Sequence, residues 1–280
     1  MGLTDGAELT YDGLLLRGIS LSGIRTAIAL PDFSFSFDVA QGYPFLLNLK
    51  NFFISHGHLD HAAGIPYIIS QKAMNRQETP NFYMPPSLIE PMDEIMKLWQ
   101  KIENHEYSYN FVPVRADQDI PIKPNYFMRP FSTIHRIESF GYTLFHRHKR
   151  LAAEFQGLSQ EQIIEIKKQG QELHDIQEIP LVSFTGDTQI EFLESRPWVK
   201  KSKILIMEAT YLDDKKSVEH ARSWGHTHLD EIIPHLDSIE SEKIVLIHVS
   251  SRYSTDESLR ILSTRISSRD KDRVVLFPGR

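Results

Sequence analysis

Residues 55–61 form the densest group of side chains in the sequence that could do chemistry. They read Ser-His-Gly-His-Leu-Asp-His and follow the apolar run Phe-Phe-Ile at 52–54, so three histidines and one aspartate fall within six residues. Imidazole and carboxylate are the ligands that Zn²⁺ accepts when thiolate is missing, and the chain contains no cysteine. On a turn between a strand and a helix, this spacing lets the side chains diverge toward two metal positions. The pattern therefore predicts half of the ligands of a two-metal site, at His56, His58, Asp60 and His61.

Three further ligand candidates follow short apolar runs much later in the chain. They are His135 in Thr-Ile-His-Arg, Asp187 in Gly-Asp-Thr and His248 in Leu-Ile-His-Val. Taken singly, a histidine after a strand is more often a structural residue, and Gly-Asp-Thr is often only a turn. Combined with the first cluster, in this order, they predict that all three join the same metal site. The alternative is a chance surface cluster, which the specific H-x-H-x-D-H spacing disfavours.

Short apolar runs predict the strands that must position these side chains. We expect strands at 14–16, 33–39, 52–54, 142–145, 181–184, 204–207 and 244–247. Helices are expected at 87–104, 159–170 and 227–239, behind the cap residues Ser87, Ser159 and Thr227. The apolar stripe of the first helix is expected to pack in the core. Strands flanked by helices indicate a layered α/β domain in which sites gather where strands end.

Composition and charge narrow the class of protein. The 280 residues are 41% hydrophobic and 24% charged, and no run approaches the roughly 18 apolar residues of a membrane span. The first six residues lack the basic and apolar regions of a secretory signal, so a cytoplasmic location without a membrane partner is expected. The net charge of −6 disfavours nucleic acid unless a local basic patch offsets it. Residues 146–150 are the candidate patch, and a solvated surface is the alternative.

The order of these motifs resembles the ribonuclease Z family, the tRNA 3′-processing endonucleases of the metallo-β-lactamase superfamily. The resemblance spans nearly the whole chain. It is closest to the short plant-type members, in Phe-Phe-Ile-Ser-His at 52–56, Phe-Thr-Gly-Asp-Thr at 184–188 and Val-Glu-His-Ala-Arg at 218–222. The stretch 207–214 is similar as well, with methionine at 207 where bacterial members usually carry histidine. The resemblance implies one domain over 1–280 with the four-layer αββα sandwich, two zinc ions (manganese is possible), precursor tRNA as substrate and a homodimer.

The resemblance also implies a division of the ligands between two metal ions. One ion would be held by His56, His58 and His135, and the other by Asp60, His61 and His248. Asp187 would bridge both, since a carboxylate has two anionic oxygens that can span ions about 3.5 to 4 Å apart. Asp60 would also lie beside the nucleophile and could orient it.

Glu208 and His226 are expected to deliver a proton to the leaving 3′ oxygen. In the family pattern, a glutamate after a buried strand holds a histidine from a later loop. A carboxylate partner raises the pKa of the histidine and favours the charged donor near neutral pH. Glu208 could instead pair with any nearby base, and His228 competes for the donor role. We favour His226 because it directly precedes the expected cap Thr227.

Two features concern the substrate. Ser250, Ser251 and Arg252 follow His248 and could contact the scissile phosphate, with capping of the next turn as an equal alternative. Typical family members insert a Gly/Pro-rich arm that grips the tRNA elbow before the Gly-Asp-Thr motif. Here only residues 136–186 separate His135 from Asp187, so we expect a reduced arm at about 146–180.

Three functions therefore stay open. The leading one is a zinc-dependent tRNA 3′ endonuclease. The first alternative is a hydrolase of the same fold that acts on a small phosphodiester, thioester or other ester, which the acidic charge and the short arm favour. The second is a non-catalytic binding protein. The complete ligand set together with Glu208 and His226 argues against the last, because a binding module needs none of them.

Overall fold

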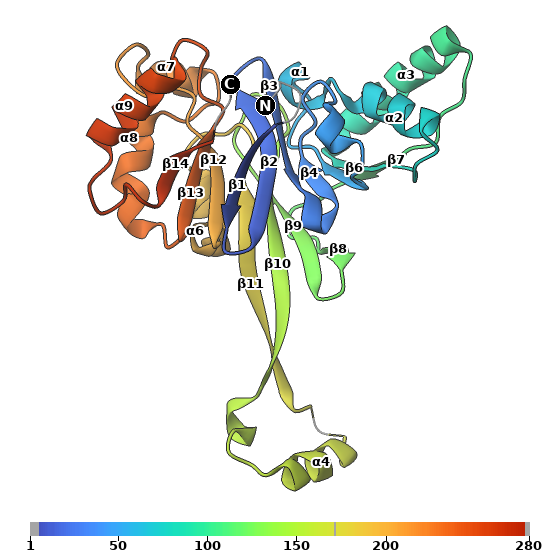
Figure 1. Cartoon of the computed structure of the whole chain (residues 1–280), viewed down its shortest axis with the longest axis vertical. Coiled ribbons are helices and arrows are strands. Elements are labelled where there is room, and N and C mark those ends of the chain that lie inside the picture. The colour runs from blue at the N-terminus through green and yellow to red at the C-terminus, as the bar shows by residue number, and fades with distance from the viewer. Residues whose placement is uncertain (1–5, 171, 278–280) are drawn as a thin grey trace.

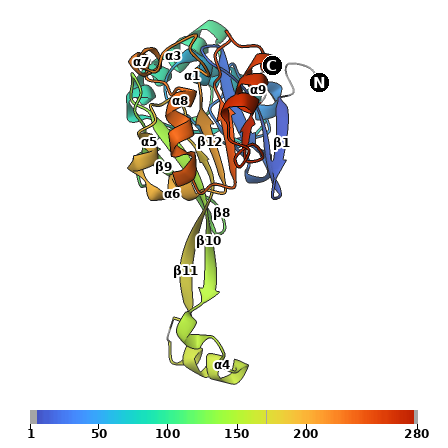
Figure 2. The same ribbon diagram turned by 90° about the vertical axis from the view of Figure 1, so that its left-hand side faces the viewer.

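The computed structural model describes residues 6–170 and 172–277. Within these ranges two seven-stranded sheets pack face to face, and helices cover their outer faces (Figures 1 and 2). This arrangement confirms the expected αββα sandwich. None of the helices in the described ranges combines the length and the hydropathy needed to cross a lipid bilayer.

The first sheet has the strand order β1-β2-β3-β4-β5-β6-β7. Its strands are β1 (Ala7–Tyr11), β2 (Leu14–Leu21), β3 (Arg25–Leu30), β4 (Phe35–Phe37), β5 (Asn51–Phe53), β6 (Asn81–Met84) and β7 (Asn110–Pro113). They pair antiparallel up to β4 and parallel from β4 to β7. The short helices η1 (Pro31–Phe33), η2 (Pro44–Leu46) and α1 (Leu59–Ala62) lie in its connections, and α2 (Ile65–Met74) and α3 (Pro86–Glu103) are the longer ones.

The second sheet has the order β14-β13-β12-β11-β10-β9-β8. Its strands are β8 (Ile120–Lys123), β9 (Tyr126–Ser132), β10 (Phe140–Leu151), β11 (His174–Phe184), β12 (Ile204–Glu208), β13 (Lys243–Ile247) and β14 (Val274–Leu276). Strands β11 to β14 are parallel. The helices of this half are η3 (Ala153–Phe155), α4 (Gln160–Lys168), α5 (Phe192–Ser195), α6 (Pro197–Lys201), α7 (Val218–Ser223), α8 (Leu229–Ile232), η4 (Ile233–Ser238) and α9 (Thr255–Arg265).

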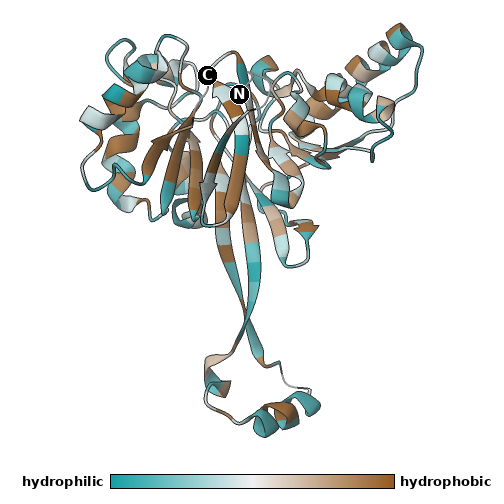
Figure 3. Cartoon of the chain, viewed as in Figure 1, coloured by the Kyte–Doolittle hydropathy of each residue, from teal (hydrophilic) through white to brown (hydrophobic). Residues whose placement is uncertain are grey.

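The core between the sheets is rich in aromatic side chains. Phe37 of β4 stacks on Phe184 of β11 with ring centroids 4.8 Å apart, and Phe53 of β5 contacts Tyr142 of β10 at 5.3 Å. Hydrophobic residues, coloured brown, are accordingly concentrated on the strands of the body (Figure 3). This packing holds the ends of β5 and β11 side by side, and the candidate ligands follow those ends.

All seven expected strands coincide with observed strands, but the one expected at 33–39 is shorter. Pro31 begins the short helix η1, and Ser34 adopts a left-handed backbone with φ of 54°. Phe33 therefore lies in a turn, and only Phe35–Phe37 pair in the sheet. The prediction of a continuous strand there was wrong because alternating phenylalanines do not reveal the turn.

The apolar stripe of α3 is only partly buried, contrary to expectation. Met92 and Met96 are buried, whereas Ile95, Trp99 and Ile102 are 41%, 42% and 69% exposed. The centres of the two sets lie about 70° apart around the helix, so only the first faces the sheet. Ser87 is not the cap either, because the helix already begins at Pro86.

The two other expected helices are present. Ser159 caps α4 by accepting from the N–H of Gln162, which completes a capping box. The segment 227–239 forms α8 and η4, but its cap is His228 rather than Thr227. The Thr227 hydroxyl donates instead to the carbonyl of Thr188 at 2.6 Å.

A two-stranded ribbon projects from the body and carries η3 and α4 at its tip (Figure 1). It consists of the far halves of β10 and β11, and we call residues 146–180 the arm. The whole of β10, from Phe140 to Leu151, is about 35–40 Å long, and its second half lies in the arm. The tip has a small core of its own, formed by Ala152, Phe155 and Leu173.

Candidate active site

The candidate site lies at the end of the molecule opposite the arm, where strands of both sheets finish. His56 and His58 follow β5, Asp187 follows β11 and His248 follows β13, while His135 lies in the β9–β10 connection. Parallel strands end at the same edge of a sheet, so residues distant in sequence meet there. The sheet packing thus assembles the site.

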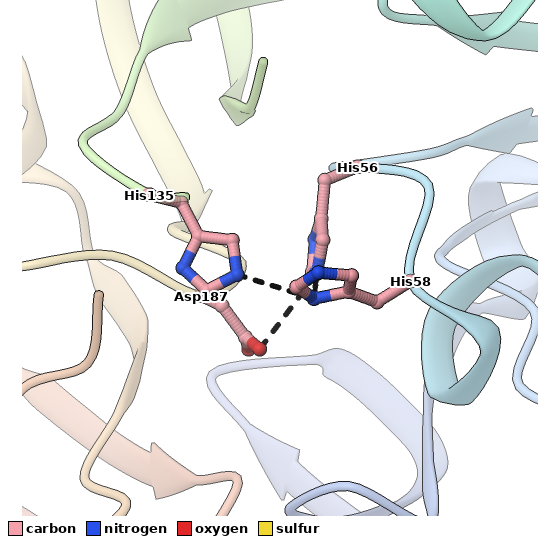
Figure 4. Close-up of side chains that lie close together, drawn as sticks. All are labelled: His56, His58, His135 and Asp187. Carbon is pink, nitrogen blue, oxygen red and sulfur yellow. Dashed lines mark hydrogen bonds and ion pairs between the residues drawn. The ribbon is translucent and has the colours of Figure 1, made fainter. Parts of the chain in front are cut away.

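The first group of potential ligands is His56, His58, His135 and Asp187 (Figure 4). His58 Nδ1 lies 3.0 Å from His56 Nε2 and 3.2 Å from His135 Nε2. His56 Nε2 lies 3.8 Å from Asp187 Oδ2. One potential ligand atom from each residue thus lies within reach of a single point.

The second group is Asp60, His61, Asp187 and His248. Asp187 Oδ2 lies 3.4 Å from His61 Nε2 and 3.3 Å from His248 Nε2. Asp60 Oδ2 lies 3.3 Å from His248 Nε2, and the N–H of Gly23 donates to it at 2.9 Å. Asp187 belongs to both groups, and the structure therefore brings together all seven residues expected as ligands.

Asp38 and Ser55 orient two of the histidines. His61 Nδ1 lies 2.7 Å from Asp38 Oδ2, so this nitrogen carries a proton and donates it to the carboxylate. The Ser55 hydroxyl donates to Asp38 at 2.8 Å, and it therefore accepts from His56 Nδ1 at 2.9 Å. In both rings Nε2 keeps its lone pair and faces the cluster, which is the orientation of a metal ligand.

A carbonyl and a hydroxyl orient two more histidines. His135 Nδ1 donates to the carbonyl of Gly225 at 2.8 Å. The Thr210 hydroxyl donates to Glu208 at 2.6 Å, so it accepts from His248 Nδ1 at 3.1 Å. The Nε2 lone pairs of these rings also face the cluster. Four histidines from three different segments thus have their ring orientation fixed by partners on the side away from the cluster.

The donor set fits divalent metal ions. Burial lowers the pKa of His56, His58 and His135, which favours the neutral rings that bind metals. Asp187 Oδ1 is buried and has no hydrogen-bond partner among the described residues, an unfavourable state that a cation would relieve. Imidazole and carboxylate are the ligands of zinc-type ions. The cluster is a divalent metal-binding site.

Glu208 and His226 form a pair beside both groups. Glu208 is fully buried, and its Oε1 accepts from the N–H of Thr188 at 2.6 Å and lies 3.1 Å from His226 Nδ1. The His226 ring lies 5.3 Å from the rings of both His135 and His248. Burial acts to lower the pKa of His226, but the Glu208 carboxylate outweighs it and raises this pKa to about 9. A charged imidazolium is therefore available at neutral pH.

His228, the competing donor, is held in a structural role. Its Nδ1 accepts from the N–H of Asp230 at 3.0 Å, where it caps α8. Its Nε2 lies 3.2 Å from the carbonyl of Asp213. Both ring nitrogens have partners within the helix start and the neighbouring loop, so the geometry favours His226.

Ser250, Ser251 and Arg252, the candidates for phosphate contact, lie outside both ligand groups. Ser250 is buried, and its hydroxyl accepts from the N–H of Arg252 at 3.4 Å and from the guanidinium of Arg252 at 3.3 Å. This is the capping geometry that was the alternative to phosphate contact. Ser251 and Arg252 are exposed.

Sequence reasoning missed several residues behind the ligands. Asp38 is fully buried, with φ of 51°, directly after β4. In the sequence, Asp38 can be recognised only as a single acidic residue that follows the run Phe-Ser-Phe. Ser20 accepts from the N–H of His248 at 2.9 Å, and Thr210 holds the ring of the same histidine. Neither has a sequence pattern of its own.

Comparisons with known proteins identify the family of the chain. Residues 37–249 match the sequence model of the beta-lactamase superfamily domain. tRNase Z TRZ1 of Arabidopsis thaliana is 34% identical over 251 residues, which cover 89% of this chain and 90% of the relative. The chloroplastic tRNase Z TRZ2 of the same plant is 32% identical over 272 residues, 96% of this chain and 76% of the relative.

Solved structures show the same fold. Human tRNase Z, short form, superposes with a TM-score of 0.56 at 18% identity, covering 98% of this chain and 94% of that one. The metallo-beta-lactamase fold protein YhfI from Bacillus subtilis superposes with a TM-score of 0.60 at 16% identity, covering 93% of this chain and 95% of that one. The domain match and the identity to the plant proteins over most of both chains establish the family: the chain belongs to the tRNase Z, or ribonuclease Z, family of the metallo-β-lactamase superfamily.

Proposed function

We propose that the chain is a zinc-dependent endoribonuclease that cleaves precursor tRNA at its 3′ end. The observation that carries the proposal is the placement of His226, held by Glu208, beside two ligand groups that share Asp187. A proton donor next to a two-metal site suits hydrolysis of a phosphodiester with a poor leaving group. The relatives named tRNase Z support RNA as the substrate.

The ligands would divide between two zinc ions, with manganese as an alternative. His56, His58 and His135 would hold one ion and Asp60, His61 and His248 the other, with Asp187 shared. When bound, the ions would activate a water molecule and neutralise charge on the attacked phosphate. Asp60 would help to orient the water: burial acts to raise its pKa, but His248 and His61 hold this pKa well below its usual range, so Asp60 is an ionised acceptor.

His226 would protonate the oxygen that leaves. Its Nδ1 faces Glu208, which leaves Nε2 to donate. Hydrolysis that releases a 3′ hydroxyl on the tRNA requires a proton at that ribose oxygen, and a raised pKa keeps the ring charged for the task. Glu208 is a positioning residue, since its hydrogen bonds fix the ring and its charge supports the imidazolium.

The RNA backbone would be held by groups outside the ligand cluster. Arg252 and Ser251 lie on the exposed turn after His248 and are candidates for contact with phosphates near the scissile bond. Ser250 would act indirectly, because its hydroxyl accepts from Arg252. The arm adds Lys149 and Arg150, which are exposed and attract phosphates at a distance.

We propose further that the enzyme is a homodimer. The arm leaves the body at the end opposite the ligand cluster, so it points away from its own site (Figures 1 and 2). An arm that grips tRNA bound at a site would then come from a partner chain. Lys149 and Arg150 of that arm would provide a local positive potential for the RNA, although the whole chain carries a net charge of −6. Sedimentation equilibrium tests this, and a monomer at micromolar concentration would contradict it.

The substrate is tested with the purified protein loaded with Zn²⁺ or Mn²⁺. A precursor tRNA with a labelled 3′ trailer should be cut after the discriminator nucleotide, and the Asp187→Asn variant should not cut it. Bis(4-nitrophenyl) phosphate is the parallel substrate. Hydrolysis of this ester without any cleavage of the RNA would refute the tRNA proposal and favour a small phosphodiester or ester as substrate.

A further inference from the structure

An exposed tryptophan and an arginine pair on the rim of the candidate site. The guanidinium carbon of Arg136 lies 4.8 Å from the centroid of the Trp224 ring. The tryptophan is 50% exposed, and Arg136 is exposed as well. In sequence, Arg136 directly follows the ligand His135, and Trp224 precedes the proton donor His226 by two residues. The pair therefore adjoins both chemical parts of the site.

The two segments that carry the pair are fastened to each other. His135 Nδ1 donates to the carbonyl of Gly225 at 2.8 Å. Gly225 has φ of 76°, and a Cβ on it would lie only 2.7 Å from His135 Nδ1. On the other side, the N–H of His226 donates to the carbonyl of Ala221 at 3.0 Å. The pair thus has a fixed position relative to the ligand and the donor.

Packing alone gives a weak reason for this tryptophan. An exposed cation–π contact contributes little to stability, and the ring leaves half of its surface in water. Flat, partly exposed aromatic rings and guanidinium planes are the groups on which single-stranded nucleobases stack. A stacked pair next to a nuclease centre has the chemistry of a base-binding platform.

We propose that Arg136 and Trp224 form a stacking platform for the base on the 5′ side of the scissile bond, the last nucleotide retained in the tRNA. This inference rests on the proposed function. His226 would protonate the 3′ oxygen of that nucleotide, so the ribose bearing its base lies beside the donor. We therefore assign the adjoining platform to that base and not to a base of the trailer. Stacking accepts all four bases, because each has a π face.

The test combines an enzyme change with a substrate change. Wild type, Trp224→Ala and Arg136→Ala are compared on a precursor tRNA and on the same RNA with an abasic ribose at the last retained nucleotide. On intact RNA, Trp224→Ala should raise KM roughly tenfold with little change in kcat, because stacking is present in the ground state and the transition state alike. On abasic RNA the KM of the same variant should differ from that of wild type by less than twofold.

Two controls separate stacking from damage to the site. Trp224→Phe keeps a ring and should restore most of the affinity. Trp99→Ala removes another half-exposed tryptophan, from α3, and should leave KM for both RNA substrates unchanged. Metal content should be equal in all variants. An equal loss on intact and abasic RNA, or no loss on intact RNA, would overturn the platform. Failure of wild type to cut any precursor would instead overturn the proposed function, and the platform with it.

Discussion

The carboxylate of Asp38 lies 2.7 Å from the Nδ1 atom of His61, and both side chains are buried. Burial raises the pKa of Asp38, although His61 and the Ser55 hydrogen bonds act to lower it. Burial acts to lower the pKa of His61, but Asp187 and Asp38 raise it well above its usual value. The pair fixes the ring from the side that faces away from the cluster and makes its Nε2 a stronger ligand.

We predict that Asp38→Ala weakens metal binding by roughly 10- to 100-fold, the usual effect of removing a carboxylate behind a ligating histidine. Competition with a chromophoric chelator measures the affinity. Asp32→Ala, which removes an exposed acid from the same region, should leave it unchanged. Circular dichroism checks the fold, since Asp38 also accepts from the N–H of Ser55. A folded variant with wild-type affinity would contradict the role.

Metal removal should lower thermal stability. The two ligand groups come from segments as far apart as residues 56 and 248, so bound ions tie these segments together in the native state alone. Free metal at 100 times its Kd stabilises by about 2.7 kcal/mol, which corresponds to a Tm shift of roughly 5–10 °C for a chain of this size. Calorimetry with and without a chelator measures it. In Asp187→Asn the chelator should have little effect, and an unchanged wild-type Tm would refute the prediction.

The proton donor gives a kinetic prediction. His226→Ala should reduce turnover of precursor tRNA by roughly 10² to 10⁴ while two metal ions per chain remain bound, because general acid catalysis is lost and no ligand is removed. Single-turnover cleavage and metal analysis measure the two effects. His105→Ala, which removes an exposed histidine after α3, serves as the control. Unchanged turnover in the variant would exclude His226 as the donor.

The pH profile should change when Glu208 is neutralised. The acid form of the donor is the active one, so kcat falls as pH rises through the pKa of His226. The Glu208 carboxylate raises this pKa, and its loss in Glu208→Gln should therefore move the alkaline limb of the kcat profile to lower pH. The limb is measured from pH 6 to 10 under single-turnover conditions. A shift to higher pH, or none, would show that Glu208 does not control the donor.

Much of the site was predictable because its residue types are rare and each follows a buried strand. Asp187 and His248 were recognised in this way, and the sheets bring them together. Asp38 was missed because its partner lies 23 residues away and one acid after Phe-Ser-Phe resembles an ordinary turn. The carbonyl of Gly225, which orients His135, left no signal at all, since a backbone atom has no sequence identity.

The fold was less completely predictable at its edges. Strand β9 was missed because Arg129 and Pro130 interrupt its apolar pattern. The exposed side of α3 was expected in the core, since a helical pattern shows which residues share a face but not how much of the helix a sheet covers. The cap of α8 shifted by one residue because the Thr227 hydroxyl bonds to Thr188, a contact distant in sequence.

Four charged residues form a network of ion pairs at the root of the arm. Arg147 of β10 lies 2.9 Å from Asp119 and 2.8 Å from Glu178 of β11. Arg129 of β9 contacts the same two acids at 2.7 and 3.0 Å. The register of β10 and β11 also shifts between Leu144 and the next residue, a bulge that bends the ribbon where it leaves the sheet. The ion pairs therefore connect the bent ribbon to the body.

We predict that the double variant Asp119→Asn and Glu178→Gln raises KM for precursor tRNA roughly fivefold, because a network of partly exposed charges contributes about 1 kcal/mol to holding the arm. The direction of the change in KM distinguishes a role in holding the arm from a simple effect of charge. Removing two negative charges near Lys149 and Arg150 of the arm would by itself strengthen RNA binding and lower KM. Hydrolysis of bis(4-nitrophenyl) phosphate, which does not reach the arm, should be unchanged.

The matched control removes the same two charges elsewhere. Glu194→Gln with Asp237→Asn breaks exposed ion pairs with Lys200 and Arg269 and should leave KM equal to wild type or lower. Steady-state cleavage at several salt concentrations provides the comparison. A change in KM that arises from charge alone decreases as salt is added, whereas a rise in KM from a misdirected arm persists. A fall in KM for the root variant would mean that its acids act only through charge and do not hold the arm.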